Sequence, residues 1–434
     1  MIDTIGSPWL AYAVLLIVTG LSRLRCGSWF APAAFVGLVW SFFTGASLLV
    51  VDYPIPSRGL WMLVVLIVAM QLGALIAHEL QPRKNVSFPA VSVASDSLMA
   101  RSRWCCIACT GVALAGCVYF WLLSLEQFNL PFTLLGVLEV GAKWTLLRYD
   151  EVLEPWSVRL LVAWLHPAGL FGGLLFACSR RLRDRVVALL TLFPAAAYSL
   201  LTAARAPALL GLTCWLGGYL AMSCIGEQGR PALFAWKRVG WFLTLAASLL
   251  LGFVMVDALR GLNWSKDFTL EAKESHITNY IFGSPAAFAD WYAHQIPGTL
   301  NWGGETFAGL YAILGLNQRI VGVYYETSNI VGAEVTNVYT AFRMLVEDFA
   351  VPGAAMASVV FGFLAGLAYS SHAARFSGTF LFLSAFYAFI MFSPLQSLFS
   401  FNGAILAWII GWLVLRNRRL LHDLPLPSRE RGIS

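Results

Sequence analysis

Arginine residues beside apolar runs are the side chains of this sequence that could do chemistry on a phosphate. Arg205 stands in the short segment Thr202-Ala-Ala-Arg205-Ala-Pro207, between two runs that carry almost no charge. The planar guanidinium group binds phosphate through two parallel hydrogen bonds. A charge at membrane depth costs about 2.5–3.5 kcal/mol on insertion scales, so such a residue is usually paired, extended to headgroups or functional. Two interpretations stay open: Arg205 extends to lipid headgroups, or it binds the diphosphate of a membrane lipid.

Residues 258–349 form the longest stretch that cannot be a membrane span, and they contain further ionisable candidates. Arg260 follows Asp257 by three residues, which places both side chains on one face of a helix. Arg343 precedes Glu347 by four residues, with the same consequence. Each pair is either a local ion pair or part of a binding site. The side chains of this stretch that could act as a general base include His276, His294, Glu305, Glu347 and Asp348.

Tryptophan and tyrosine residues are interspersed with these charges, as at Trp291, Tyr292 and Trp302. Such rings suit stacking on sugars. They also suit the aromatic belt that many membrane proteins place at the membrane–water interface, which is the more general explanation. Each general-base candidate, taken singly, suits an exposed surface position as well.

The composition identifies the class of protein that must position these side chains. The chain has 434 residues, of which 59% are hydrophobic and 12% are charged, whereas soluble domains carry about 25% charged residues. This composition predicts an all-α polytopic integral membrane protein. The net charge of +6 is explained by basic loops on the cytoplasmic side of the membrane, so we expect no nucleic-acid partner.

Several classes of site are missing from the sequence. We find no P-loop, no GxSxG elbow and no HExxH motif. The cluster Cys105-Cys106-x-x-Cys109 opens an apolar run without a histidine partner, so we expect no zinc site. The sequence therefore predicts neither a metal nor a cofactor, and an energised substrate must arrive already activated through the membrane.

About 11 apolar runs are long enough to cross a bilayer, which takes roughly 20 residues. Most of the Lys and Arg residues fall on one side if the N-terminus lies outside and the C-terminus inside. The predicted spans are 8–22, 30–51, 59–79, 104–124, 158–178, 186–203, 206–223, 240–257, 350–371, 379–395 and 402–416.

These spans divide the chain into four parts. The outer loop 125–157 is largely apolar, so we expect an interfacial helix there. Residues 258–349, named the outer segment below, are predicted to form a lid of three short helices. The first helix begins at Ser284-Pro285, the second follows Glu305, and the third follows Thr336-Asn337 and runs through Asp348. The predicted parts are a membrane domain 1–257 with spans one to eight, the outer segment 258–349, a membrane domain 350–419 with spans nine to eleven, and a cytoplasmic tail 420–434.

One segment carries a likeness to a known family. Val335-Thr336-Asn337-Val338-Tyr339-Thr340, followed by Asp348-Phe349, resembles the C-terminal region of bacterial Wzy-type oligosaccharide repeat-unit polymerases. That family includes O-antigen, common-antigen and exopolysaccharide polymerases. It also has many spans, an arginine that opens a mid-chain span, as at Arg205, and a large periplasmic loop before the final spans. The family usually has glycine after the Asp-Phe pair, where this chain has Ala350.

The resemblance implies a metal-independent glycosyltransferase of the bacterial inner membrane. The donor would be a growing glycan on undecaprenyl diphosphate and the acceptor a single lipid-linked repeat unit. The chain would work beside a chain-length-regulating co-polymerase and a flippase. By this resemblance Arg205, Arg260 and Arg343 would bind the leaving diphosphate, Arg148 and Arg319 the second diphosphate, and Asp348 would be favoured as base over Glu347, His294 and Glu305.

Three alternatives stay open. An O-antigen ligase would use the same chemistry and transfer the finished glycan to another lipid. A lipid-linked oligosaccharide flippase or another transporter is a second alternative. Transporters tend to show internal repeats and ionisable residues at mid-span, whereas the charges here gather outside the apolar runs. A membrane scaffold without chemistry is the third.

Overall fold

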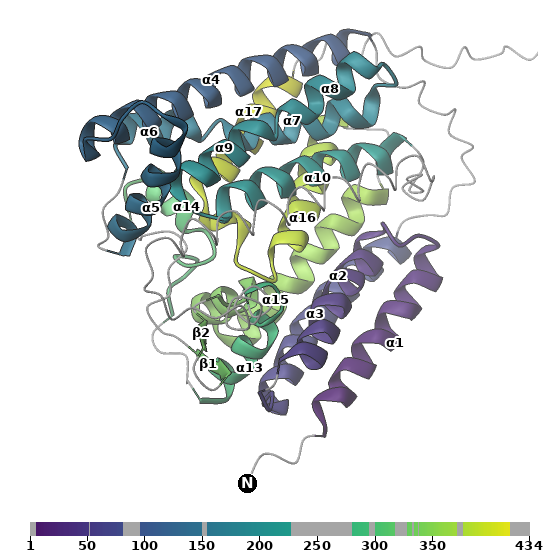
Figure 1. Cartoon of the computed structure of the whole chain (residues 1–434). Coiled ribbons are helices and arrows are strands. Elements are labelled where there is room, and N and C mark those ends of the chain that lie inside the picture. Colours follow the sequence, from purple (N-terminus) through teal and green to yellow (C-terminus); the bar gives the residue numbers. More distant parts are fainter. Residues whose placement is uncertain are drawn as a thin grey trace, which may run out of the picture.

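The structure, a computed structural model, describes residues 6–51, 53–80, 96–149, 154–226, 280–294, 300–316, 328–331, 334–336, 338–370 and 376–416. These residues are almost entirely helical (Figure 1). The helices of the first half are α1 (Pro8–Cys26), α2 (Pro32–Val50), α3 (Ser57–Leu80), α4 (Asp96–Phe128), α5 (Leu134–Tyr149), α6 (Trp156–Val162), α7 (Leu165–Cys178), α8 (Leu182–Leu190), α9 (Phe193–Thr202) and α10 (Ala206–Gly226). The elements of the second half are α13 (Ser284–His294), α14 (Ala308–Ile313), β1 (Ser328–Val331), β2 (Glu334–Thr336), α15 (Ala341–Ser370), α16 (Phe376–Phe392), the 3-10 turn η1 (Leu398–Ser400) and α17 (Asn402–Leu415).

Eight helical segments of the described residues are long and apolar enough to cross a membrane. This result confirms a polytopic membrane protein. The segments are Pro8–Cys26, Pro32–Val50, Ser57–Leu80, Leu98–Phe128, Trp156–Cys178, Leu182–Thr202, Ala206–Ile225 and Ala341–Ser370.

The other three predicted spans have different outcomes. Helices α16 and α17 coincide with predicted spans 379–395 and 402–416, but both are shorter than the eight segments above. The 14 residues of α17 rise about 21 Å, against about 30 Å of hydrocarbon in a typical bilayer. The predicted span 240–257 lies outside the described residues. A total of eleven spans therefore stays a prediction.

Glycines bring the backbones of α3 and α15 into direct contact. A Cβ added at Gly362 would overlap the carbonyl oxygen of Met70. A Cβ added at Gly366 would lie 2.6 Å from the carbonyl oxygen of Ala74, closer than real Cβ atoms come. Small residues of this kind allow close packing between membrane helices, where water supplies no hydrophobic driving force. The contact holds α15 rigidly against α3.

A second contact of this kind joins α7 and α10. A Cβ added at Gly173 would overlap the carbonyl oxygen of Trp215, and one at Gly169 would lie 2.6 Å from the carbonyl oxygen of Gly211. Because Arg205 immediately precedes α10, this packing also fixes where that arginine stands.

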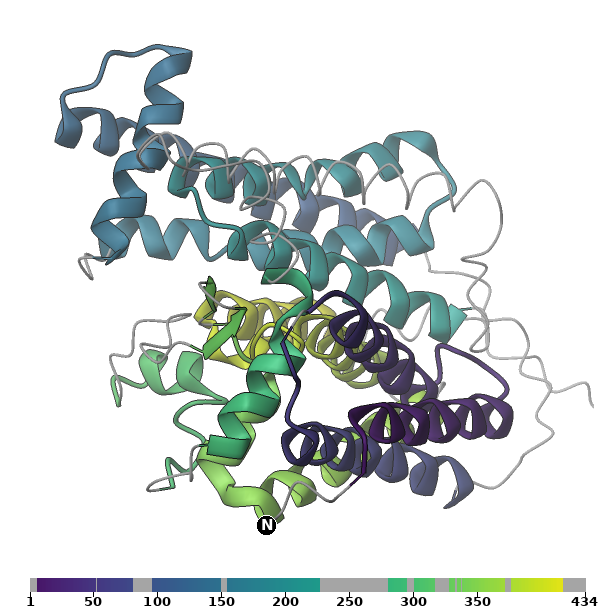
Figure 2. The ribbon, with the colours of Figure 1, turned by 60° about the horizontal axis from the view of Figure 1, so that its bottom comes forward.

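The short elements outside the long helices gather at one end of the bundle. Figures 1 and 2 place α5, α13, α14 and the β1–β2 ribbon toward the left end in both views. The expected helix in the loop 125–157 is present as α5, and the helices expected from Ser284 and after Glu305 are present as α13 and α14. Helix α13 packs tightly on α3, because a Cβ at Gly59 would overlap the backbone of Ala289.

The third predicted helix of the outer segment is present as the first part of α15. The helix α15 runs from Ala341 through Asp348 to Ser370, and a kink at the non-helical residue Ala350 divides it in two. This kink coincides with the predicted boundary between the lid helix and the span 350–371. The outer segment also contains an antiparallel ribbon in which Ser328 pairs with Thr336, a small exception to the all-α prediction.

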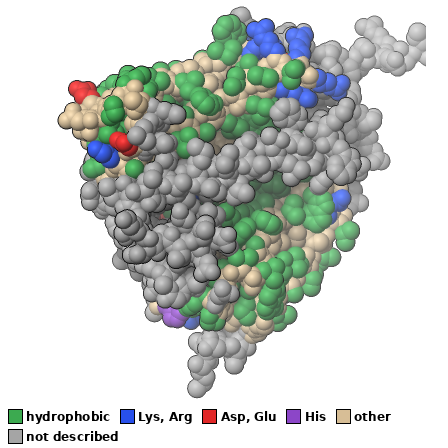
Figure 3. All heavy atoms as spheres, viewed as in Figure 1, with side chains coloured by type: hydrophobic (Ala, Val, Ile, Leu, Met, Phe, Trp, Pro, Cys, Tyr) green, Lys and Arg blue, Asp and Glu red, His purple; other side chains and the backbone are tan. Residues whose placement is uncertain are grey.

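Charged side chains are unevenly distributed over the surface. In the face shown in Figure 3, basic side chains gather at the upper right, and apolar side chains are spread over the upper part and the lower right. Arg180, Arg181 and Arg183, at the start of α8, are exposed. Figure 1 places α8 at the end of the bundle opposite to α5, α13 and α14, so a basic end and a lid end can be distinguished.

The α3–α15 contact can be tested by a substitution that adds a single methyl group at Gly362. We expect Gly362→Ala to lower the free energy of unfolding by about 1–3 kcal/mol, because the methyl meets a backbone carbonyl that cannot move aside. Thermal unfolding of the purified protein in detergent measures the effect. Gly20→Ala in α1 is the matched control, because a Cβ there meets nothing within 4 Å. An equal loss of stability in both variants would contradict the assigned packing.

Candidate functional site

Arg343 is a buried cation near the start of α15. Only 3% of its side chain is exposed, and its Nε donates to Glu347 Oε1 at 2.8 Å, one turn further along. The centre of the guanidinium lies 4.1 Å from the ring centroid of Tyr339 and 4.9 Å from that of Trp291. A carboxylate and two aromatic faces thus surround the charge, an arrangement that compensates part of its loss of water.

Arg205 is the second buried arginine at the lid end. Its side chain is 3% exposed, and the guanidinium lies 4.5 Å from the ring centroid of Tyr280. It follows a left-handed C-cap at Ala203, with φ 44° and ψ 39°, which ends α9 and turns the chain toward α10. A side chain that extends to bulk headgroups would be exposed, so this burial favours binding over anchoring.

One segment carries aromatic rings for both arginines. Tyr280 contacts Arg205, and Trp291 on α13 contacts Arg343. Residues 280–294 therefore contact two cations that are 138 positions apart in the sequence. Two guanidinium groups near one segment can neutralise an anion with more than one negative charge.

Asp348 holds a loop against the start of α15. Its side chain is fully buried, with Oδ1 accepting from the backbone N–H of Glu305 at 3.0 Å and Oδ2 from that of Thr306 at 2.7 Å. Its carbonyl oxygen accepts from the N–H of Trp302 at 3.1 Å. Asp348 therefore positions the loop that contains Glu305, and both carboxylate oxygens are already engaged by the backbone.

Two strained residues flank this loop. Trp302 has φ 49° and Ala350 has φ 52° with ψ 177°. The conformation of Ala350 belongs almost only to glycine, and a residue with a Cβ pays about 1–3 kcal/mol of strain to adopt it.

His294 forms a chain of polar contacts with Asp290 and Tyr53. Its Nδ1 lies 3.1 Å from Asp290 Oδ1 and 3.0 Å from the Asp290 carbonyl oxygen. The phenol of Tyr53 donates to the same Oδ1 at 3.0 Å. Burial, the hydrogen bond to Asp290 and the negative charge of that carboxylate raise the pKa of Tyr53 above its ordinary value. The imidazole of His294 is 67% exposed, so an oriented ring faces outward.

The structure brings together most of the predicted site residues that it describes. Glu347 contacts Arg343, and Asp348 contacts the backbone of Glu305. His294 lies one turn after Trp291, the ring that Arg343 covers. Arg148 lies in α5, but its side chain is outside the described part, and Arg260 and Arg319 lie outside the described residues altogether. Within the described ranges, no three His, Cys, Asp or Glu side chains could hold a metal ion together.

Three partners of the site were not identified from the sequence. Asp290 stands four residues before His294, a spacing that places both on one helix face and could have indicated the pair. Tyr53 is 237 positions from Asp290, and Tyr280 is far from Arg205, so no local pattern could reveal either contact.

The chain matches no family model, no curated protein and no solved structure. The likeness to the polymerase family therefore rests on the short segments named above, and the roles of the site residues rest on geometry.

The strain at Ala350 predicts an unusual response to substitution. We expect Ala350→Gly to raise the free energy of unfolding by about 1 kcal/mol, because glycine adopts this conformation without strain. Ala357→Gly, in the regular part of α15, is expected to lower it by about 0.5–1 kcal/mol. Denaturant unfolding of the two variants and of the wild type measures the sign of both changes in the free energy of unfolding. A loss of stability in Ala350→Gly would show that the helix break is not strained.

Proposed function

We propose that this protein is a bacterial polysaccharide polymerase of the inner membrane, which joins oligosaccharide repeat units carried on undecaprenyl diphosphate. The observation that carries the proposal is the pair of buried arginines, Arg205 between α9 and α10 and Arg343 near the start of α15. Both contact aromatic rings of the segment 280–294. Cations buried beside a membrane favour a lipid that carries a compact, multiply charged anion, and a diphosphate is such an anion.

The two arginines would stabilise the leaving group. In the proposed reaction a hydroxyl of the acceptor's terminal sugar attacks the anomeric carbon of the donor glycan. The new C–O bond forms as the bond to the diphosphate breaks, and undecaprenyl diphosphate leaves with the electron pair. Negative charge grows on the diphosphate during this step, where fixed guanidinium groups stabilise the transition state most strongly. Arg260, Arg148 and Arg319 stay predicted contributors to the two diphosphate sites.

His294 is the base that the geometry favours for the attacking hydroxyl. It is exposed, and Asp290 fixes the orientation of its ring, as a base that must meet a substrate requires. Asp348 is better suited to positioning, because the backbone of the 305–306 turn occupies both of its oxygens. Glu347 is held by Arg343, and Glu305, half-buried on the loop fixed by Asp348, is the second candidate base.

The distribution of charge supports the proposed orientation. The exposed arginines at the start of α8 lie at the end of the bundle opposite to the lid. Cytoplasmic loops are enriched in Lys and Arg, so the basic end would be cytoplasmic and the lid periplasmic. The N-terminus would then be periplasmic and the C-terminus cytoplasmic, and a lipid-linked repeat would reach the site from the outer leaflet.

The arginine assignment is tested by chain growth in vitro. Purified protein is given lipid-linked repeat units without nucleotide, and product length is read on a gel. We expect Arg343→Ala and Arg205→Ala to lower the rate by about 10²–10³, the usual effect of removing one transition-state donor. The rate of chain growth is expected to stay low in Arg343→Lys as well, because lysine lacks the planar fork of donors that arginine has.

The control for this assay is Arg183→Ala, an exposed arginine at the basic end, which is expected to polymerise at the wild-type rate. Wild-type rates in both Arg205→Ala and Arg343→Ala would overturn the site. Deletion of the gene separates polymerase from ligase: a polymerase mutant accumulates lipid with one repeat, whereas long chains stranded on the lipid would identify a ligase.

The Asp290–His294 pair is tested by a double-mutant cycle. We expect His294→Ala to lower kcat by about 10²–10⁴, the usual contribution of a general base. Asp290→Asn should lower kcat by at least tenfold with little change in KM, because only the orientation of the imidazole is lost. Adding Asp290→Asn to His294→Ala should then have no further effect. Independent, additive losses would mean that Asp290 does not act through His294.

A further inference from the structure

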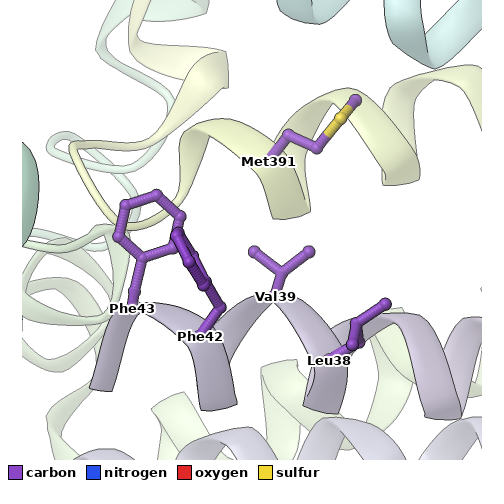
Figure 4. Close-up of a pocket in the computed structure, with 5 residues that line it drawn as sticks. All are labelled: Leu38, Val39, Phe42, Phe43 and Met391. Carbon is purple, nitrogen blue, oxygen red and sulfur yellow. The ribbon is translucent and has the colours of Figure 1, made fainter. Parts of the chain in front are cut away.

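An apolar groove lies between α2 and α16. Its lining residues are Leu38, Val39, Phe42 and Phe43 from α2 and Met391 from α16. In Figure 4 the side chains of Val39, Phe42 and Phe43 point from α2 toward α16. Its volume is about 420 Å³, within the range of about 300–1,000 Å³ that small-molecule sites occupy. Every lining side chain is apolar, so the groove suits a hydrocarbon chain and not a sugar or a phosphate.

Aromatic contacts connect the groove to Arg205. The rings of Phe42 and Phe43 lie 5.9 Å and 6.1 Å from the ring of Phe282. Phe282 is two residues beyond Tyr280, whose ring contacts Arg205. The groove therefore ends beside the segment whose Tyr280 contacts Arg205.

The same helix also connects the groove to Arg343. Trp40 stands between Val39 and Phe42, and its ring packs 5.1 Å from that of Phe342, the residue before Arg343. The Trp40 indole donates to Ser393 Oγ, and the carbonyl of Ser393 accepts from the N–H of Ala341 at the start of α15. The wall of the groove and the start of α15 around Arg343 thus belong to one packed unit.

We propose that this groove binds the isoprenoid chain of a polyprenyl diphosphate whose headgroup is held by Arg205 and Arg343. The inference rests on the proposed function and assigns a place to the lipid part of that substrate. The isoprenoid chain of such a lipid matches the apolar side chains of the groove, and its diphosphate matches the two arginines. A phospholipid acyl chain would fit the groove alone, but the arginines favour the doubly charged diphosphate head.

The groove orients the polyprenyl chain more than it raises the affinity for the lipid. A polyprenyl chain leaves a hydrocarbon environment when it enters the groove, so burial yields little of the free energy that it would yield from water. Contacts with branched and aromatic side chains instead select one path for the chain. A fixed path would hold the diphosphate against the arginines, and it would present the glycan to the side of the lid.

The test places a photoreactive group in the groove of the full-length protein. Phe42 is 60% exposed, so Phe42→p-benzoylphenylalanine keeps an aromatic ring in place. The variant is reconstituted in phosphatidylglycerol nanodiscs, given undecaprenyl phosphate, irradiated and analysed by mass spectrometry. We expect an adduct with undecaprenyl phosphate, while the same group at Leu49, 77% exposed on α2, gives only phosphatidylglycerol adducts.

Two results would overturn the inference. A phosphatidylglycerol adduct at position 42 that undecaprenyl phosphate does not displace would make this an ordinary lipid-facing surface. An internal cross-link from position 42 to residues 240–257 would mean that this predicted span fills the groove. In a second measurement Val39→Trp and Leu38→Trp should each reduce the polyprenyl adduct at least fivefold, and Leu49→Trp should not.

This experiment is independent of catalysis, because undecaprenyl phosphate carries no sugar. A polyprenyl adduct in a protein that does not polymerise lipid-linked repeats would refute the proposed function and keep the groove. Polymerisation without a polyprenyl adduct would refute the groove and keep the proposed function.

Discussion

The buried charge of Arg343 is the constraint on which the lid end depends. Removing one partner from a buried ion pair typically costs about 3–5 kcal/mol, because the other charge stays buried without compensation. Arg343 therefore requires Glu347 one turn away, Tyr339 before α15, and Trp291 from a different helix. Helix α13 must dock on α3 to deliver Trp291, and the close approach at Gly59 allows that docking.

The break in α15 gives this charge its location. A regular helix through Ala350 would carry Arg343 and Asp348 along the axis of the membrane span. The strained residue instead lets the first turns, Ala341 to Phe349, follow their own direction while the rest packs on α3. Asp348, next to the break, ties those turns to the 305–306 backbone. Strain at one residue and two hydrogen bonds thus place a charged helix end beside a loop with an exposed tryptophan and a glutamate.

The sequence predicted the parts of the structure that depend on local pattern. Apolar length identified the long helices, and Ser284-Pro285 marked the start of α13. The spacing of Arg343 and Glu347 indicated the ion pair that is present. The predicted boundary between the third lid helix, which ends at Asp348, and the span 350–371 coincides with the break at Ala350, although an alanine gives no local signal for positive φ.

Contacts between distant segments could not be predicted in this way. Asp348 was favoured as a base because of the segment that it stands in, but its hydrogen bonds go to residues more than 40 positions away. The contact of Tyr53 with Asp290 depends on how α13 lies on α3. The α2–α16 groove has no signature in the sequence, because its lining residues look like those of any membrane helix.

Under the proposed function, the head and the tail of one substrate meet two different physical environments. The side chains that line the groove are all apolar and offer only dispersion contacts, whereas the two arginines offer positive charge. A lipid diphosphate can satisfy both only in one orientation, with its chain along α2 and its anomeric oxygen toward α13. His294 on α13 and Trp302, whose backbone N–H donates to the carbonyl of Asp348, both have exposed rings. If both proposals hold, the boundary between the apolar groove and the buried cations would set the direction in which a glycan leaves the membrane, before any sugar is recognised.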